Sequence, residues 1–281
     1  MELLEKANES LRARGLNIRA EKIEYYTIGR GRPADRLHTS DGQWVPNDFN
    51  RLADGTNITY IIASNRGATA SGLTAQQTTD AIQRSFATWA ADKALGNVEL
   101  VRRAFPNSDV SIFDELVDDA IGVSLFDDFG PADGDPFAAD IVNVGFLPWL
   151  FFEIVGGPGG GDGILAFSVS FIFVDENGAP TDLNGDNRVD IALNEVYYND
   201  AWGNPAVENT SDNPWNIGQA LPAIDVETVA LHENGHSLQL GHFGSPPPKA
   251  VMNPFYGGVL TTPLPLDRAG LQSLWSSWPN R

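Results

Sequence analysis

The order of apolar and polar positions divides the first 55 residues into three parts. Residues 2–14 have helical periodicity with mixed charge, and Gly15 follows as a residue suited to ending a helix. Residues 18–28 alternate well enough to form a strand or two. Residues 29–55 are rich in Gly, Pro, Asp and Asn, which is typical of loops. We therefore separate residues 1–55 from the rest of the chain as an N-terminal extension.

Two further stretches have the periods of buried elements. Residues 74–94 place three large apolar side chains at helical spacing, and we expect these in the core rather than in a binding site: Ile82, Phe86 and Trp89. Strand patterns follow near residues 141–144 and 167–173. The side chains expected on a buried sheet face are Ile141, Val142, Val144, Phe167, Val169, Phe171 and Phe173.

A later helix is predicted from Val226 to about Leu240. Asp225 immediately precedes it and is a residue type that caps helix N-termini, because its carboxylate accepts hydrogen bonds from unpaired N–H groups. This helix places two histidines one turn apart, so that His232 and His236 leave the same face. Glu233 lies between them, as in hydrolases that use a glutamate as general base beside zinc.

Three of the four histidines in the chain fall within eleven residues. His242 is six residues beyond His236, too far to share the helix face, so it must return after a turn for which Gly241 supplies a permissive backbone. Two imidazoles one turn apart and a third after a turn can hold zinc at about 2 Å and leave a fourth position for water. A polar surface helix with scattered histidines is the alternative, and the spacing argues against it.

The same segment resembles the extended zinc motif of the metzincin proteases, His-Glu-x-x-His-x-x-Gly-x-x-His. Ten residues after His242 comes Met252, in the stretch Ala-Val-Met-Asn-Pro-Phe-Tyr of residues 250–256, which is similar to the methionine turn of the matrixins. Residues 266–275 resemble the closing helix of that family. The likeness is strong from residue 225 onward and extends loosely to residues 56–278, where residues 58–63 and 140–146 resemble early strands and residues 159–173 the glycine-rich approach and edge strand above the cleft.

The resemblance implies an α+β, zincin-like fold. We expect a twisted, mainly parallel sheet with an antiparallel edge strand, an active-site helix, and a small C-terminal subdomain holding the methionine turn and the closing helix. The domain would cover residues 56–281, with an upper subdomain to about 241 and a lower one over 242–281. Residues 1–55 would then be the remnant of an inhibitory prosegment or part of the mature fold, and Asp35 or Asp41 could ligate the zinc in place of water.

The resemblance also implies roles for individual residues. Met252 would form an apolar floor beneath the imidazoles, although an ordinary core methionine would pack in nearly the same way. Tyr256, four residues later, is not expected to ligate the metal. A peptide would add as a strand along residues 163–167, using Gly163, Ile164, Leu165 and Ala166. Pro254 and Tyr256 would wall a pocket beside the zinc that selects an apolar residue.

Two departures from the family pattern matter. Gln239 stands where the motif has glycine, so a positive φ there would strain the backbone, unless the turn relies on Gly241 instead. The extra histidines with which matrixins bind a second, structural zinc are also missing, because only His38 remains. We therefore expect one zinc per chain.

A second chemical signal lies in residues 182–190. Oxygen-bearing positions alternate there as in calcium loops, with side chains from Asp182, Asn184, Asp186 and Asp190 and a carbonyl from Arg188. Asn187 takes the sharp-turn position that glycine prefers, and Leu193 cannot supply a final bidentate carboxylate, for which Glu195 or Asp200 could compensate. An Asx-rich turn that binds nothing is the alternative. Further calcium positions of matrixins are loosely resembled by Asp162 and by Asn199 with Asp200. The aspartate-rich residues 127–140 are either a solvated loop or another cation site.

Composition narrows the partners. The 281 residues are 42% hydrophobic and 10% aromatic, which supports a core, and the net charge of −19 disfavours nucleic acid and anionic membranes. There is no cysteine, so disulfides and a cysteine-based latency switch are excluded. No apolar segment indicates a membrane span or a signal peptide, and we expect a secreted protein whose signal has been removed.

These observations predict a secreted, monomeric zinc endopeptidase that acts on peptide or protein substrates, with structural calcium. The alternatives are a catalytically silent metal- or calcium-dependent binding protein on a protease fold, a zinc hydrolase acting on a non-peptide amide or ester, and a protease kept latent by residues 1–55. Glu233 argues against the silent form, since neither folding nor metal binding requires it.

Overall fold

A computed structural model describes residues 2–29, 36–37, 42–48, 51, 56–106, 108–123 and 137–278. Asp35, His38 and Asp41, and most of the aspartate-rich residues 127–140, lie outside this part of the chain. Within it no helix combines the length and the apolar character needed to cross a membrane. The helices are α1 (Glu2–Ala13), α2 (Ala75–Ala91), the 3-10 helix η1 (Lys93–Leu95), α3 (Phe113–Ile121), α4 (Trp149–Gly156), α5 (Gly160–Gly163), α6 (Val226–Ser237) and α7 (Pro265–Trp275).

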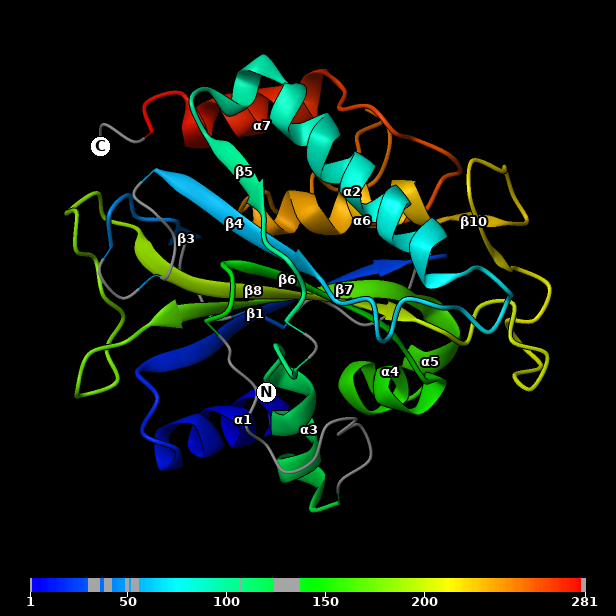
Figure 1. Cartoon of the computed structure of the whole chain (residues 1–281), viewed down its shortest axis with the longest axis horizontal. Helices are drawn as coiled ribbons and strands as arrows, with labels where there is room; N and C mark the ends of the chain where they lie inside the picture. Colours follow the sequence, from blue (N-terminus) through cyan, green and yellow to red (C-terminus); the bar gives the residue numbers. More distant parts are fainter. Residues whose placement is uncertain are drawn as a thin grey trace.

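One large sheet runs through the molecule in the order β2-β1-β7-β8-β6-β4-β5, and β3 pairs with β8 (Figure 1). Its strands are β1 (Ile18–Thr27), β2 (Arg36–Leu37), β3 (Gly42–Gln43), β4 (Asn57–Ile62), β5 (Glu99–Arg102), β6 (Ile141–Leu147), β7 (Ile164–Phe173) and β8 (Val189–Asn199), while β9 (Trp215–Asn216) and β10 (Ile224–Asp225) form a small separate pair. Strands β5, β4, β6 and β8 are parallel, and β7 is antiparallel to β8. The predicted fold, a mainly parallel sheet with an antiparallel strand toward one edge, is confirmed.

Helices cover both faces of this sheet. Helices α2, α6 and α7 lie on one side, and α1, α3 and α4 lie on the other (Figure 1). Each face has its own apolar core, the first including Trp89 and Met252 and the second including Leu11 and Phe113. Because successive side chains of a strand alternate between faces, neighbouring residues of one strand belong to different layers.

Local sequence explains where several elements begin and end. Thr74 and Gln77 form a capping box at the start of α2, since each side chain accepts a hydrogen bond from the other residue's backbone N–H. Gly15 adopts φ 73° after α1, as expected for a glycine that ends a helix. The helix predicted over residues 74–94 is confirmed, although it ends at Ala91 and passes into η1.

The extension is built into the same sheet. Strand β1 pairs antiparallel with β7 from Ile18 opposite Phe173 to Thr27 opposite Ile164. The buried Arg51 guanidinium binds the Asp140 carboxylate at 3.0 Å, which ties a later part of the extension to the start of β6. Strand β1 therefore lies along the same strand, β7, to which a peptide is expected to add.

Candidate metal centre and active site

Helix α6 is fixed at its start by the predicted cap. Asp225 accepts hydrogen bonds from the backbone N–H of Thr228 at 2.8 Å and from its hydroxyl at 2.6 Å. The backbone N–H of Asp225 in turn donates to the Tyr256 hydroxyl at 2.9 Å. The helix therefore begins where predicted but ends at Ser237, three residues before the expected end.

Three buried tryptophans hold the rest of α6 in place. Their indole N–H groups donate to backbone carbonyls of the helix or its end, from Trp89 to Leu231, from Trp44 to Ser237 and from Trp275 to Leu238. The last two carbonyls lie in the final turn, where no intrahelical donor follows. These bonds fix the position and rotation of α6, and with them the side chains that α6 presents.

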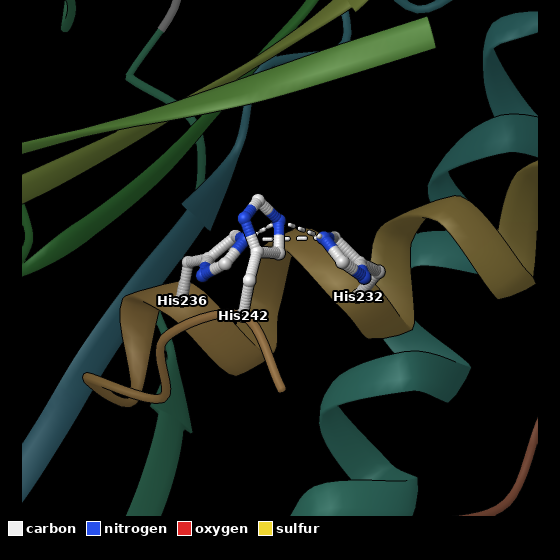
Figure 2. Close-up of side chains that lie close together, drawn as sticks. All are labelled: His232, His236 and His242. Carbon is white, nitrogen blue, oxygen red and sulfur yellow. Dashed lines mark hydrogen bonds between the residues drawn. The ribbon is translucent and has the colours of Figure 1, made fainter. Parts of the chain in front are cut away.

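The three histidines converge as the motif predicts (Figure 2). The Nε2 atoms of His232 and His236 are 3.0 Å apart, and the Nε2 atom of His242 is 3.2 Å from each of them. Among the described residues, these three form the one group of three or more His, Asp or Glu side chains whose ligand atoms lie within 4.8 Å of one another. Two of the three imidazoles are buried.

Backbone carbonyls set the tautomers of two imidazoles. The Nδ1 atom of His232 lies 2.7 Å from the carbonyl oxygen of Val251, and that of His236 lies 2.7 Å from the carbonyl of Leu240. A carbonyl only accepts, so each Nδ1 carries the proton and each Nε2 presents a lone pair to the centre of the triad. Burial, and then the neighbouring His236 and His242, hold the pKa of His232 well below its usual value, which keeps this ring neutral.

The turn that returns His242 lies at Gln239, where φ is 66°. The φ of Gly241 is not positive, so the expectation that the turn relies on Gly241 is wrong. The side-chain amide of Gln239 is buried, and its nitrogen and oxygen have no hydrogen-bond partner. Residue 239 therefore adopts a left-handed backbone without being glycine, at the cost of local strain.

Glu233 is fully buried between the two helical histidines. Burial raises the pKa of Tyr198, and the nearby Glu233 charge raises it further. The pKa of Tyr26 is raised by burial, then by Tyr256 and then by Glu233. Met252 is also fully buried and belongs to the core cluster that includes α2 and α6.

The residues expected to bind a peptide lie beside the triad, but they contact the chain's own strand β1. The backbone N–H of Thr27 donates to the Pro254 carbonyl at 3.2 Å, and Thr27 accepts from the backbone N–H of Tyr256 at 2.8 Å. The backbone N–H of Ile28 donates to the Gly163 carbonyl at 3.1 Å, and Tyr26 pairs with Ala166.

Sequence reasoning missed Glu24 and Tyr26 at this site. The Tyr26 ring stacks on the His232 ring with centroids 3.8 Å apart and planes 13° apart. A Glu24 carboxylate oxygen lies 3.4 Å from Nδ1 of His236. The sequence does hold a signal for them, because Glu24 and Tyr26 are two residues apart in a predicted strand and therefore share one face. A glutamate on the buried face of a strand is unusual.

The predicted calcium loop folds as a series of Asx turns. Asp182 accepts hydrogen bonds from the backbone N–H groups of Asp186 and Asn187, both at 3.0 Å, and Asp190 accepts from Leu183 at 3.0 Å. Asn187 has φ 66° at the expected sharp turn. The carboxylates of this loop do not gather as the histidines do. Calcium at Asp182, Asn184, Asp186, Arg188 and Asp190 stays a prediction.

The carboxylates suggested as further calcium ligands have other partners. Glu195 accepts from the backbone N–H groups of Ile112 and Phe113 at the start of α3, at 2.7 and 3.0 Å. Asp200 accepts from the backbone N–H of Ala70 at 2.7 Å. Asp162 accepts from the Trp149 indole and the Asn209 amide, both at 2.7 Å.

Comparison with known proteins agrees with this geometry. The family model described as Matrixin matches residues 170–276, which include β8, α6, the triad and α7. Matrix metalloproteinase-25 of Mus musculus is 43% identical over 70 residues, which are 23% of this chain and 11% of that protein. Its Homo sapiens counterpart is 43% identical over 74 residues, 24% of this chain and 13% of that protein.

The chain therefore spans a small part of the length of these relatives. The family match, the sheet and the three converging histidines point the same way, and residues 170–276 are similar to the matrixins.

Proposed function

We propose that the chain is a zinc-dependent endopeptidase whose general base is Glu233. The observation that carries this proposal is the convergence of three Nε2 atoms, two of them from imidazoles whose Nδ1 protons are held by backbone carbonyls. Glu233 lies between the two helical histidines in the sequence, and the match of residues 170–276 to the Matrixin model supports a metallopeptidase.

The donor set fits zinc. Three nitrogens at about 2.0–2.1 Å from a tetrahedral zinc would be roughly 3.3–3.4 Å apart. The observed separations of 3.0 and 3.2 Å need only small side-chain shifts to reach that spacing. When bound by His232, His236 and His242, zinc would supply a Lewis acid that polarises the scissile carbonyl and lowers the pKa of water.

The chain's own residues perform the proton transfers. The Glu233 carboxylate accepts a proton from the attacking water and later delivers it to the leaving amine. Its burial among the core side chains of α6 keeps it in one position, so little reorganisation is needed during the reaction. The carbonyls of Val251 and Leu240 keep the two imidazoles in the tautomer that offers Nε2.

Substrate would bind as an extended chain between β7 and residues 254–256. In this structure β1 bonds to backbone groups on both sides of this path, among them those of Gly163, Pro254 and Tyr256. A substrate that replaced β1 would make main-chain hydrogen bonds that do not depend on its sequence. The site beside His232 would then favour substrates with an apolar or aromatic side chain at that position.

The finer assignments belong to the same proposal. We propose secretion, a monomeric state and structural calcium in the loop of residues 182–190. A binding protein without catalysis is the second candidate, and the observation that favours it is β1, which lies along the strand that substrate would use.

Hydrolysis of quenched casein by the purified full chain tests the proposal. We expect turnover that a chelator removes and that added zinc restores. Glu233→Gln should remove the turnover as the chelator does. Glu227→Gln on the same helix is its matched control, since Glu227 pairs with Arg84 near the start of α6, away from the triad. Hydrolysis that continues after complete zinc removal would contradict the proposal.

A further inference from the structure

The end of β1 passes over the histidines between two backbone partners. On one side it pairs antiparallel with β7, with Tyr25 opposite Phe167 and Tyr26 opposite Ala166. On the other side Thr27 forms a parallel bridge with Phe255. The backbone N–H groups of Thr27 and Ile28 donate to the carbonyls of Pro254 and Gly163. The Thr27 carbonyl accepts from the backbone N–H of Tyr256, so hydrogen bonds close both edges of the strand.

The side chains that β1 presents to α6 contact the metal ligands directly. Tyr26 stacks on His232, and the Glu24 carboxylate lies 3.4 Å from His236. Both side chains are buried, with exposed fractions of 4% for Tyr26 and 6% for Glu24. The intervening Tyr25 points to the opposite layer, where its hydroxyl donates to the Val155 carbonyl at 3.0 Å.

We infer that residues 24–28 are an intramolecular occupant of the substrate site, so that peptides bind only the fraction of chains in which this segment has withdrawn. The inference rests on the proposed function. It follows from the geometry because a peptide strand needs unpaired backbone groups on both walls. Strand β1 already pairs with Ile164 and Ala166 and bonds to Gly163, Pro254 and Tyr256.

Occupancy by a tethered strand resists competition in solution. A segment joined to its site has an effective concentration in the millimolar range for a short flexible connection, and it binds before a dilute peptide does. Weakening the contact between β1 and the ligands shifts the equilibrium toward the open site, and it does so without altering the histidines, Glu233 or β7.

Tyr26→Ala is therefore the informative variant, and Tyr25→Ala is its matched control on the same strand. The probe is a fluorescein-labelled synthetic peptide with the sequence of residues 20–29, added to the zinc-loaded full chain in the Glu233→Ala background so that it is not consumed. Fluorescence anisotropy measures its binding. Tyr26→Phe keeps the stacked ring and should behave as the parent chain.

We expect Tyr26→Ala to bind the probe on the order of tenfold more tightly than the parent, because the variant loses the stacked pair that holds β1 over His232. Tyr25→Ala and Tyr26→Phe should bind as the parent does. Equal binding by Tyr26→Ala and the parent, or equal gains for Tyr25→Ala and Tyr26→Ala, would overturn the inference.

Casein hydrolysis by the same tyrosine variants with Glu233 intact separates the two proposals. Tighter probe binding without hydrolysis retains the occupant and rejects the peptidase. Hydrolysis by the parent as fast as by Tyr26→Ala, with equal probe binding, retains the peptidase and rejects the occupant.

Hydrogen exchange on the parent chain covers the case in which Tyr26→Ala does not fold. A peptidyl hydroxamate has to displace β1, whereas acetohydroxamate is too small to do so. Loss of amide protection at Tyr26 and Thr27 with the first compound alone supports the occupant, as does binding of the second compound alone. Binding of the peptidyl compound with those amides still protected refutes it.

Discussion

The sulfur of Met252 lies so close to Gly235 that a β-carbon on residue 235 would overlap it. The same β-carbon would also come within 3.2 Å of Trp89. Glycine between Asn234 and His236 thus allows α6 to pack directly against Met252. The space between them does not admit one further carbon.

Gly235→Ala should therefore destabilise the fold by about 1–3 kcal/mol, the usual cost of overpacking a core. Because the clash is with Met252, combining it with Met252→Ala should cost less than the sum of the two single changes. Urea unfolding of the four proteins measures this coupling. Gly257→Ala is the control, since nothing lies within 4 Å of that position. Additive effects would show that the two residues do not interact.

Gln239→Gly should stabilise the protein by about 0.5–1 kcal/mol. A left-handed conformation costs a non-glycine residue about 1–2 kcal/mol, part of which is offset by the greater freedom of glycine in the unfolded chain. Removing the buried amide adds to the gain, because its nitrogen and oxygen are unpaired. Gln239→Val should lose about 1–2 kcal/mol at the same φ of 66°. Thermal unfolding ranks the three proteins, and a glycine variant less stable than the parent would refute this explanation.

Stability should fall as pH rises from about 4.5 to about 8, in part because of Glu195. Burial, and then the nearby Asp114, raise its pKa from 4.5 to about 8, against the hydrogen bonds from Phe113, Ile112 and Tyr197. A carboxyl whose pKa is raised by folding stabilises the native state fully below its unfolded pKa, and that contribution is lost as pH rises through the folded value.

Glu195→Gln should flatten this pH dependence by a few kcal/mol, since one unit of pKa difference corresponds to about 1.4 kcal/mol. Urea unfolding at pH 5 and at pH 8 measures the effect. Glu176→Gln replaces an exposed glutamate and should leave the dependence as it is. An unchanged pH profile in Glu195→Gln would show that another group is responsible.

Asp267 joins the methionine turn to the closing helix. Its carboxylate accepts from the backbone N–H groups of Val251, Met252 and Leu264, at 2.9, 3.1 and 2.8 Å. Asp267→Asn should cost about 2–3 kcal/mol, because it removes a charged acceptor and turns an amide N–H toward these donors. Asp212→Asn changes an exposed aspartate and is the control in the same unfolding assay. Equal stability of the two variants would contradict this role.

Local signals predicted much of the fold and the site. The cap at Asp225, the helix with Ile82, Phe86 and Trp89, and the convergence of the histidines follow from short-range spacing, and the structure has all of them. The pairing of residues 18–27 with 164–173 could not be predicted in this way. Alternation shows that a segment is a strand but does not identify its partner.

Helices α3 and α4 escaped prediction for different reasons. Helix α3 buries three acidic side chains, Asp114, Glu115 and Asp118, so its polar positions do not mark a solvent face. Helix α4 is nearly all apolar, and a short apolar run fits a buried strand as well as a helix. Sequence alone does not decide between Gln239 and Gly241 for the turn, because glycine is the usual residue at a positive φ but tertiary contacts can impose that conformation on another residue.

The central claim, that zinc and Glu233 together hydrolyse peptide bonds, is tested most directly by comparing Glu233→Gln with the parent in one experiment. Each of three proteins carries Tyr26→Ala, which opens the site: this parent, the parent with Glu233→Gln, and the parent with Glu227→Gln as control. Zinc per chain and the kcat/KM for a quenched peptide are measured on the same samples of each. We predict one zinc in every protein and a loss of kcat/KM of about 100-fold or more for Glu233→Gln alone, since general base catalysis contributes about 10²–10⁴-fold. Hydrolysis by Glu233→Gln at the parent's rate, with zinc retained, would contradict the claim.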